Sequence, residues 1–426
     1  MLIFRTFAMA ALLASGCLAG LTAIVVHAAV DDKLPVGPSA GDMVLSPFYR
    51  WSDAMPALPG VVLKKEPLAL QETMPAASQA MRILYSSTDQ RWQSGQVPVS
   101  GVLFLPNVAP PSEGWPLLAW AHGTVGIADR CAPSWTGLRE RDAAYINRWL
   151  ERGFAVVATD YQGLGGPGPH PYTFWQAEGR SILDAIRAAR TIGPQVISDR
   201  VFLAGQSQGG GAALGAAILA ETYAPELNIL GAVLTAPNST FPDGPVALPA
   251  RQSNTVFLSL ASGGLRENAP RIEDLLTSKG LALLEVAREG CTREIARKSR
   301  ELQVESVSEL LTVTPDILDA LRIPTTDMPL ASIPFPVLIA TGQADRTIAP
   351  LRQYAVAAAL CAAGNHVSWR LYDGLGHDGV LHGSLNEAFA FARAQLDGQG
   401  FASTCRALER PGPPGERNPH APFNDD

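Results

Sequence analysis

The stretch at residues 200–215 constrains the fold of this chain more than any other. Apolar residues at 201–204 lead into Gly205-Gln206-Ser207-Gln208-Gly209, and a run of small residues follows. On a strained turn between a strand and a helix, a serine hydroxyl projects outward and the next backbone N–H faces the same space. Glycines on either side let strand and helix approach closely, since a Cβ there would clash. We predict a strand, a sharp turn and a helix with Ser207 as nucleophile; an ordinary glycine-rich turn is the alternative.

Apolar runs alternate with amphipathic helical patterns from residue 116 onward. Such alternation is typical of an α/β fold with a mostly parallel sheet and helices on both faces, here preceded by a β-rich entry at 45–105. The expected strands are residues 80–87, 97–105, 116–121, 154–159, 201–204, 229–236, 336–341 and 367–372. The expected helices are residues 145–152, 181–192, 210–221, 351–363 and 385–396.

The alternation stops between Pro237 and Pro334, where helical patterns at 272–276, 281–288 and 317–321 replace it. We interpret residues 237–334 as a helical cap inserted into a core made of 29–236 and 335–409. A cap at this point of the chain would lie over the carboxyl ends of the strands, where open α/β sheets bind ligands. A separate helical domain is the alternative. Residues 410–426 carry five prolines and few apolar residues, which predicts a loose tail.

The first 28 residues have the pattern of an export signal. Arg5 precedes an apolar run at 7–26, and Ala28 satisfies the small-residue rule for cleavage. We therefore expect a secreted or periplasmic protein. Attachment of a lipid at Cys17 is the less favoured alternative, and an uncleaved anchor is another because the run is near membrane-spanning length.

Composition limits the kind of partner. The net charge is −7 and no basic run is present, which argues against nucleic acid as a partner and favours a neutral or apolar substrate.

Four cysteines remain after the signal, an even number that allows three disulfide connectivities, with buried free thiols as the alternative. They are Cys131, Cys291, Cys361 and Cys405. The absence of a C-x-x-C pair and of histidines at zinc spacing predicts no metal site.

A serine nucleophile needs a base and a carboxylate that orients it. His377 lies in a glycine-flanked loop just past the last expected strand, and His382 is the fallback base. Asp345 directly follows the preceding apolar strand. Carboxyl ends of parallel strands share one edge of the sheet, so Asp345 and His377 are expected to meet Ser207 there. An ordinary surface carboxylate is the alternative for Asp345.

An oxyanion formed at the serine needs two backbone N–H donors. Gln208 offers one by its position after the nucleophile. The sequence Trp120-Ala121-His122-Gly123-Thr124 leaves an earlier strand and offers Thr124 or Gly123 as the other. His122 would then be structural, although a satisfied buried histidine explains it equally well.

These pieces together resemble the secretory lipase family of α/β-hydrolases, the yeast lipase A type. The resemblance covers about residues 45–400, and its motifs occur in the family's order. They are His122-Gly123-Thr124, Thr159-Asp160-Tyr161-Gln162-Gly163-Leu164-Gly165, Gly205-Gln206-Ser207-Gln208-Gly209-Gly210, and the loops of Asp345 and His377. The resemblance implies an α/β-hydrolase fold, a Ser207-Asp345-His377 triad and cleavage of acylglycerols or simpler esters without a cofactor. Gln206 departs from the aromatic residue or histidine common in the family, which affects pocket shape more than mechanism.

By the same resemblance, Cys131 pairs with Cys291 and Cys361 with Cys405. The sequence thus predicts an exported serine esterase or lipase for short- to medium-chain esters, acting on a small-molecule or lipid ester substrate and in contact with a lipid interface. A peptidase or acyltransferase on the same fold and a catalytically inactive envelope binding protein are the alternatives. The oligomeric state stays open.

Overall fold

The structure is a computed structural model of the chain. It describes residues 45–70, 74–90, 93, 95–168, 170–246, 257–258, 272–313 and 327–425. The predicted export signal with Cys17 and the predicted cap helix at 317–321 lie outside these residues. No helix in the part of the chain that is described has the length and apolar character needed to cross a membrane.

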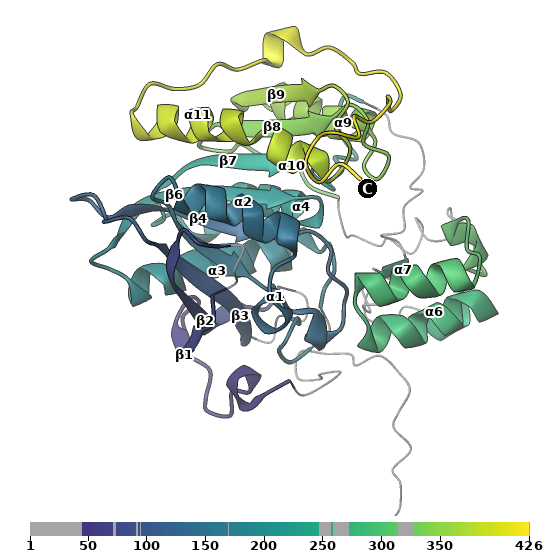
Figure 1. Ribbon diagram of the computed structural model, residues 1–426, viewed down its shortest axis with the longest axis horizontal. Coiled ribbons are helices and arrows are strands. Elements are labelled where there is room, and N and C mark those ends of the chain that lie inside the picture. The colour runs from purple at the N-terminus through teal and green to yellow at the C-terminus, as the bar shows by residue number, and fades with distance from the viewer. Residues whose placement is uncertain are drawn as a thin grey trace, which may run out of the picture. The chain divides into compact units, whose positions relative to one another are not determined.

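A sheet of nine strands forms the centre of the protein, in the order β1-β2-β3-β5-β4-β6-β7-β8-β9 (Figure 1). Strands β1 to β3 pair antiparallel, β3 is antiparallel to β5, and β4 to β9 run parallel. The strands are β1 Val62–Leu68, β2 Ala77–Thr88, β3 Gln96–Pro106, β4 Trp115–Ala121, β5 Ala155–Thr159, β6 Ile197–Gln206, β7 Ile229–Thr235, β8 Val337–Gly342 and β9 Val367–Tyr372. The predicted α/β class with a mostly parallel sheet is confirmed.

Both faces of the sheet are covered by helices because successive residues of each central strand point to opposite sides. In β4, Leu117 and Ala119 belong to the same apolar cluster as residues of helices α3, α4 and α9, whereas Leu118 and Trp120 belong to the cluster that includes residues of α2 and α11. The helices of the core are α1 Pro133–Thr136, α2 Glu140–Leu150, α3 Trp175–Ile192, α4 Gln208–Tyr223, α9 Pro350–Ala362, α10 Gly379–Gly383 and α11 Leu385–Leu396. The sheet and its two helical layers therefore hold the carboxyl ends of β4 to β9 at one rigid edge.

Two helices begin earlier than predicted. The helix expected at 145–152 begins at Glu140, and the one expected at 181–192 begins at Trp175. The first turn of α2 carries Glu140 and Asp142, whose negative charges stabilise a helix N-terminus through its dipole. At the start of α3, the Glu178 side chain instead accepts a hydrogen bond from the Thr173 backbone N–H at 2.8 Å. An apolar periodicity does not detect such turns, which explains the late predicted starts.

Within the insertion between β7 and β8, the described stretch 272–313 carries helices, which agrees with the predicted helical cap. Helices α6 Ser278–Glu289 and α7 Thr292–Glu301 lie side by side (Figure 1). Their apolar residues form a core of their own, which includes Leu275, Leu284 and Leu310 and extends to Ile127 and Tyr172 of the sheet domain. The exact bounds of the insertion stay predictions.

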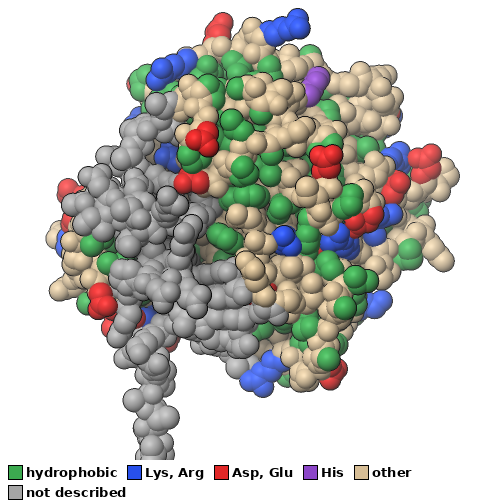
Figure 2. Space-filling view, turned by 180° about the vertical axis from the view of Figure 1, so that it is seen from behind, with side chains coloured by type: hydrophobic (Ala, Val, Ile, Leu, Met, Phe, Trp, Pro, Cys, Tyr) green, Lys and Arg blue, Asp and Glu red, His purple; other side chains and the backbone are tan. Residues whose placement is uncertain are grey.

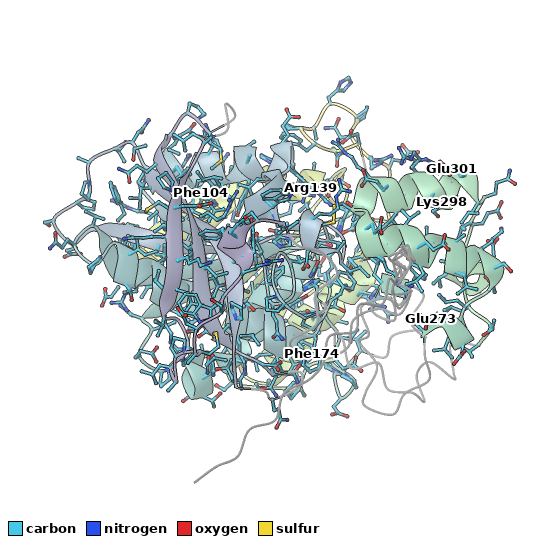
Figure 3. The ribbon with its side chains drawn as sticks, turned by 90° about the horizontal axis from the view of Figure 1, so that it is seen from below. Phe104, Arg139, Phe174, Glu273, Lys298 and Glu301 are labelled. Carbon is cyan, nitrogen blue, oxygen red and sulfur yellow. A yellow bond between two sulfur atoms is a disulfide. The ribbon has the colours of Figure 1, made fainter. Side chains whose placement is uncertain are left out.

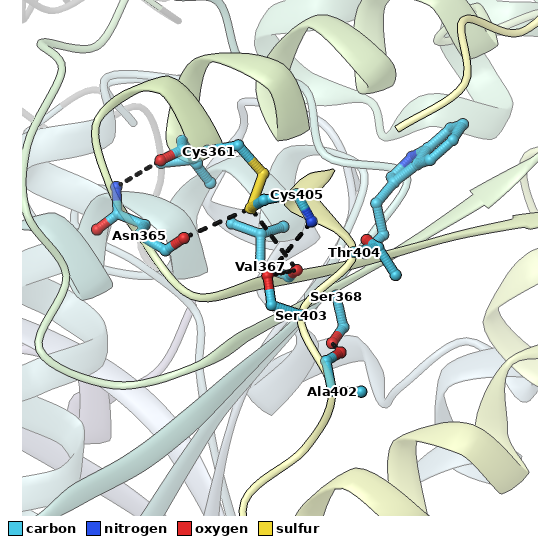
Figure 4. The surroundings of a disulfide bond; sticks show 10 residues. Cys361, Asn365, Val367, Ser368, Ala402, Ser403, Thr404 and Cys405 are labelled. Carbon is cyan, nitrogen blue, oxygen red and sulfur yellow. Dashed lines mark hydrogen bonds between the residues drawn. A yellow bond between two sulfur atoms is a disulfide. The ribbon is translucent and has the colours of Figure 1, made fainter. Parts of the chain in front are cut away.

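Both predicted disulfides are present. Cys131–Cys291 joins the loop after β4 to the residue preceding α7. Cys361–Cys405 joins the end of α9 to the chain beyond α11, and the Cys405 Sγ also lies 3.5 Å from the Asn365 carbonyl oxygen (Figure 4). Each bond therefore ties a peripheral segment to the sheet domain.

The prediction of a loose tail is wrong. Residues 411–425 run along the loops that follow β8 and β9, and the backbone N–H of Gly415 donates to the Gln343 carbonyl at 2.9 Å. The side chain of Asn424 is buried. Hydrogen bonds and one ring contact, between Phe423 and His382, hold this segment, and its polar, proline-rich composition gave no sign of either.

The charged side chains of the surface are mixed. On the face seen in Figure 2, acidic and basic side chains are interspersed among apolar and polar ones. The described side chains on this face therefore form no large patch of a single charge.

Removing either disulfide should lower the free energy of unfolding. The loops closed span 160 and 44 residues. In the chain-entropy model, their loss costs about 5 and about 4 kcal/mol respectively, as upper values. Denaturant unfolding of Cys131→Ala/Cys291→Ala and Cys361→Ala/Cys405→Ala measures this. Four reactive thiols in the unfolded, unreduced wild-type protein would contradict both bonds.

Candidate active site

Ser207 lies on the predicted sharp turn between β6 and α4. Its backbone has φ 60° and ψ −120°, a conformation that L-residues rarely adopt. A Cβ at Gly205 would lie 2.1 Å from the Gly209 carbonyl oxygen, and one at Gly209 would lie 1.9 Å from that of Ala121. Both positions therefore need glycine. Ser207 is half-buried between the buried Gln206 and Gln208, so its side chain alone reaches the open side of the turn.

The structure brings Asp345 and His377 together at the same sheet edge. The Nδ1 atom of His377 lies 2.8 Å from the Asp345 Oδ2 atom, and the carboxylate is fully buried. A carboxylate can only accept this hydrogen bond, so Nδ1 carries the proton and Nε2 is the basic nitrogen of the ring. Asp345 thereby fixes the tautomer that a general base requires.

Asp345 is itself held by three further donors. The backbone N–H groups of Thr347 and Ile348 each donate to its Oδ1 at 2.8 Å. The side-chain amide of Gln353 donates to its Oδ2, also at 2.8 Å. These donors stabilise the ionised carboxylate and leave its orientation little freedom. Asp345 is therefore a structured, buried acid and not the surface carboxylate weighed as its alternative.

His382, the fallback base, is engaged elsewhere. Its Nε2 atom lies 3.0 Å from the Arg141 carbonyl oxygen, and its ring packs on Phe423 at a centroid distance of 4.6 Å. Burial lowers the pKa of the His382 imidazole. These contacts give His382 a structural role beside the loop of His377.

Two of the predicted oxyanion residues, Gly123 and Gln208, lie next to Ser207. An ideal Cβ on Gly123 would come 3.6 Å from the Ser207 Cβ, so the Gly123 backbone borders the serine side chain. Thr124 is held by a 2.8 Å hydrogen bond between its hydroxyl and that of Tyr172. Gln208 is the first residue of α4, where backbone N–H groups have no intrahelical acceptor. This arrangement can offer N–H donors from two sides of the serine.

Arg139 connects the loop of residues 123–126 to the cap. Its guanidinium donates to the Thr124 carbonyl and, at 2.7 Å, to the Thr292 hydroxyl at the start of α7. Figure 3 shows Arg139 on the side of the sheet domain that carries α6 and α7. The backbone of Thr292 also donates to the Val125 carbonyl at 2.9 Å. The cap and the loop of residues 123–126 are therefore one connected structure.

His122 supports this loop from beneath. His122 is buried, and its Nδ1 lies 2.7 Å from the Gly123 carbonyl oxygen. The Tyr161 hydroxyl donates to the His122 carbonyl at 2.8 Å. Burial lowers the pKa of the His122 imidazole and raises that of the nearby Asp160 carboxyl. These contacts suit the structural role predicted for His122.

Sequence reasoning missed the polar residues behind Gln208. The Gln208 side-chain amide donates to the Glu178 Oε1 at 2.7 Å and lies 3.0 Å from the His170 Nε2. Burial raises the pKa of Glu178 to about 8. Glu178 is 30 residues from Gln208 in sequence, and no local pattern links the two. This buried cluster anchors the first residue of α4.

Gln206 has a different role from the one predicted. Its amide donates to the His377 carbonyl at 3.1 Å, and its Oε1 accepts from Arg141 at 3.1 Å. The side chain is buried. Gln206 therefore links the nucleophile turn to the histidine loop rather than shaping a pocket.

Glu178 makes the stability of this region depend on pH. A carboxyl whose pKa rises to about 8 on folding keeps its proton while the unfolded chain releases it. The free energy of unfolding therefore falls as pH rises from about 4.5 to 8, by up to about 1.4 kcal/mol per pH unit. Glu178→Gln should remove this slope, and Glu285→Gln, at an exposed position on α6, should retain it. Denaturant unfolding at pH 5 to 8 measures both, and coinciding slopes for wild type and Glu178→Gln would contradict the assignment.

Comparison with known proteins identifies the family. Residues 131–399 match the family model described as secretory lipase. A probable inactive lipase of Mycobacterium tuberculosis is 31% identical over 200 residues, which are 42% of this chain and 42% of that protein. Lipase A of Moesziomyces aphidis is 30% identical over 229 residues, 50% of this chain and 47% of that protein. The matches thus span less than half the length of these curated relatives.

A solved structure of Candida antarctica lipase A in its closed state superposes with a TM-score of 0.66 at 22% identity, covering 86% of this chain and 89% of that one. At this identity the likeness concerns the fold, which is the predicted α/β-hydrolase fold. The family match extends over well more than half of the chain. The chain belongs to the secretory lipase family.

Proposed function

We propose that this protein is a serine carboxylester hydrolase with Ser207 as nucleophile, His377 as general base and Asp345 as the orienting acid. The observation that carries the proposal is the 2.8 Å contact between His377 Nδ1 and Asp345 Oδ2 at the sheet edge where Ser207 lies. Membership of the secretory lipase family supports the same chemistry.

The reaction begins when His377 Nε2 takes the proton of the Ser207 hydroxyl as its oxygen attacks the ester carbonyl carbon. The tetrahedral oxyanion accepts hydrogen bonds from the N–H groups of Gln208 and of Gly123 or Thr124. His377 then returns the proton to the departing alkoxide. Water, activated by the same imidazole, hydrolyses the acyl-enzyme and restores Ser207.

Asp345 acts by charge as well as by orientation. Its carboxylate is fully buried and accepts hydrogen bonds from Thr347, Ile348 and Gln353. A fixed negative charge beside Nδ1 stabilises the imidazolium that forms when His377 takes the serine proton. No cofactor enters any step.

The substrate is a small-molecule or lipid ester with a short to medium acyl chain. The related Moesziomyces protein is named a lipase, and the cap joins the oxyanion loop through Thr292 and Val125. We propose that the cap walls the acyl site. Its residues Leu275, Leu284 and Leu310 are buried in the core of the cap itself, so they support the wall from within instead of lining it.

A catalytically inactive binding protein is the second candidate, because a relative is named a probable inactive lipase. The Asp345–His377 pair and the strained backbone of Ser207 favour the enzyme. A fluorophosphonate probe separates the two, since only a serine activated by its base is labelled rapidly.

We also propose export: the predicted signal at 1–28 and the two disulfides suit an oxidising compartment, secreted or periplasmic.

Ser207→Ala should abolish hydrolysis of p-nitrophenyl butyrate while the protein stays folded, with a loss in kcat on the order of 10⁴-fold or more.

Asp345→Asn should lower kcat for the same ester by roughly 10⁴-fold, because an amide favours the wrong tautomer of His377. Asp373→Asn, which changes a carboxylate four residues from His377, is the matched control and should retain most activity. If Asp373→Asn is instead the damaging change, the acid is misassigned.

The proposed acyl wall predicts a preference for acyl-chain length, which kcat/KM values for a series of p-nitrophenyl esters measure. Each methylene that contacts an apolar wall contributes about 0.8 kcal/mol, so two or three extra carbons favour a longer ester by roughly 10- to 100-fold. We expect kcat/KM for p-nitrophenyl esters to peak at medium length, above acetate and palmitate. A flat profile from acetate to palmitate would remove the acyl wall from the proposal.

A further inference from the structure

Segment 411–425 contacts both loops that carry the proposed acid and base. On the loop of Asp345, the Gln343 side-chain amide donates to the Pro413 carbonyl at 2.9 Å, and Gly415 N–H donates to the Gln343 carbonyl at the same distance. Gln343 is two residues before Asp345. The first half of the segment is therefore hydrogen-bonded to the acid loop.

The second half of segment 411–425 reaches the loop of His377. The backbone N–H of Asn418 donates to the Gly374 carbonyl at 2.8 Å. The side chain of Asn424 accepts from Gly376 N–H at 2.6 Å and donates to the carbonyls of Gly374 at 2.9 Å and Asn418 at 2.7 Å. Gly376 is the residue directly before His377. The segment thus bridges the acid loop and the base loop.

The chemistry of the Asn424 site requires a short amide. Its oxygen meets an N–H group and its nitrogen meets two carbonyls, so the site needs an acceptor and two donors on one planar group. An aspartate keeps the acceptor and loses both donors. Asn424 is only 5% exposed, and a Cβ on Gly379 would lie 2.1 Å from its Oδ1. The surrounding backbone is therefore closely fitted to this side chain.

The histidine loop has a matching contact on its other side. Gln206 donates to the His377 carbonyl at 3.1 Å. Asn424 thus holds the Leu375–Gly376 peptide and Gln206 holds the His377–Asp378 peptide, so the two contacts fix the chain before and after His377. A loop rich in glycine, Asp373-Gly374-Leu375-Gly376, has little conformational preference of its own. Its position must come from such outside contacts.

We propose that Asn424 is a positioning residue for the proposed ester hydrolysis, and that segment 411–425 sets the place of the His377 ring relative to Asp345 and Ser207. The inference rests on the proposed function for its kinetic consequence. Asn424 touches no substrate; it acts through the backbone of Gly376. A shift of about 1 Å in a catalytic group can cost roughly 10²-fold in rate.

The test compares Asn424→Ala and Asn424→Asp with His420→Ala, a control in the same segment whose side chain is exposed. With p-nitrophenyl butyrate, both Asn424 variants should lose roughly 10- to 100-fold in kcat with KM changed less than two-fold, because the defect lies in the base and not in substrate binding. His420→Ala should match wild type. Fluorophosphonate labelling of Ser207 should slow in parallel with kcat.

Hydrogen exchange over residues 372–382 gives a readout that does not depend on activity. Both Asn424 variants should exchange faster there than wild type, with the exchange of β6 and α4 unchanged. If Asn424→Ala does not fold, the near-isosteric Asn424→Asp decides the result. An inactive wild-type protein with the expected exchange pattern would overturn the proposed function and leave the loop contact standing. An active wild type, with folded Asn424 variants whose kcat stays within two-fold, would overturn the positioning role.

Discussion

The hydrogen bond between His377 and Asp345 is the contact on which the geometry of the site depends. It joins two loops from neighbouring parallel strands, and it forms at 2.8 Å because β8 and β9 pair in register up to Gly342 and Tyr372. A charge buried as completely as that of Asp345 is tolerated only when several donors compensate it. Thr347, Ile348 and Gln353 supply these donors, so the local fold of the acid loop and the orientation of its carboxylate are coupled.

The turn that carries Ser207, the proposed nucleophile, depends on a different constraint, which is steric. Gly205 and Gly209 allow the β6–α4 turn to lie directly against Ala121. The strained backbone conformation of Ser207 is retained because the packed structure around the turn stabilises it. The same closeness brings Gly123 beside the serine. The close packing of the ends of β4 and β6 thus creates the space in which an oxyanion could be stabilised.

The parts of the site that follow a local rule could be predicted from the sequence. Ser207, Asp345 and His377 each stand just past an apolar strand, and the convergence of parallel strand ends follows from the topology. Asn424, Gln206 and Glu178 escaped prediction because each is defined by a partner far along the chain: 48 residues separate Gly376 from Asn424, and 171 separate Gln206 from His377. No periodicity or motif encodes such pairs. The same limit applies to segment 411–425, whose hydrogen bonds replace the apolar surface that a sequence pattern can detect.

The Cys131–Cys291 bond has a mechanical consequence for the helical insertion. It fixes the beginning of α7 to the loop after β4, and the backbone contacts of Gly126 with Cys291 and of Val125 with Thr292 reinforce that point. A body attached covalently at one end can swing but cannot slide away. While this bond is intact, any rearrangement of α6 and α7 leaves the Cys291 end beside the loop of residues 123–126 and displaces the far ends of the helices most.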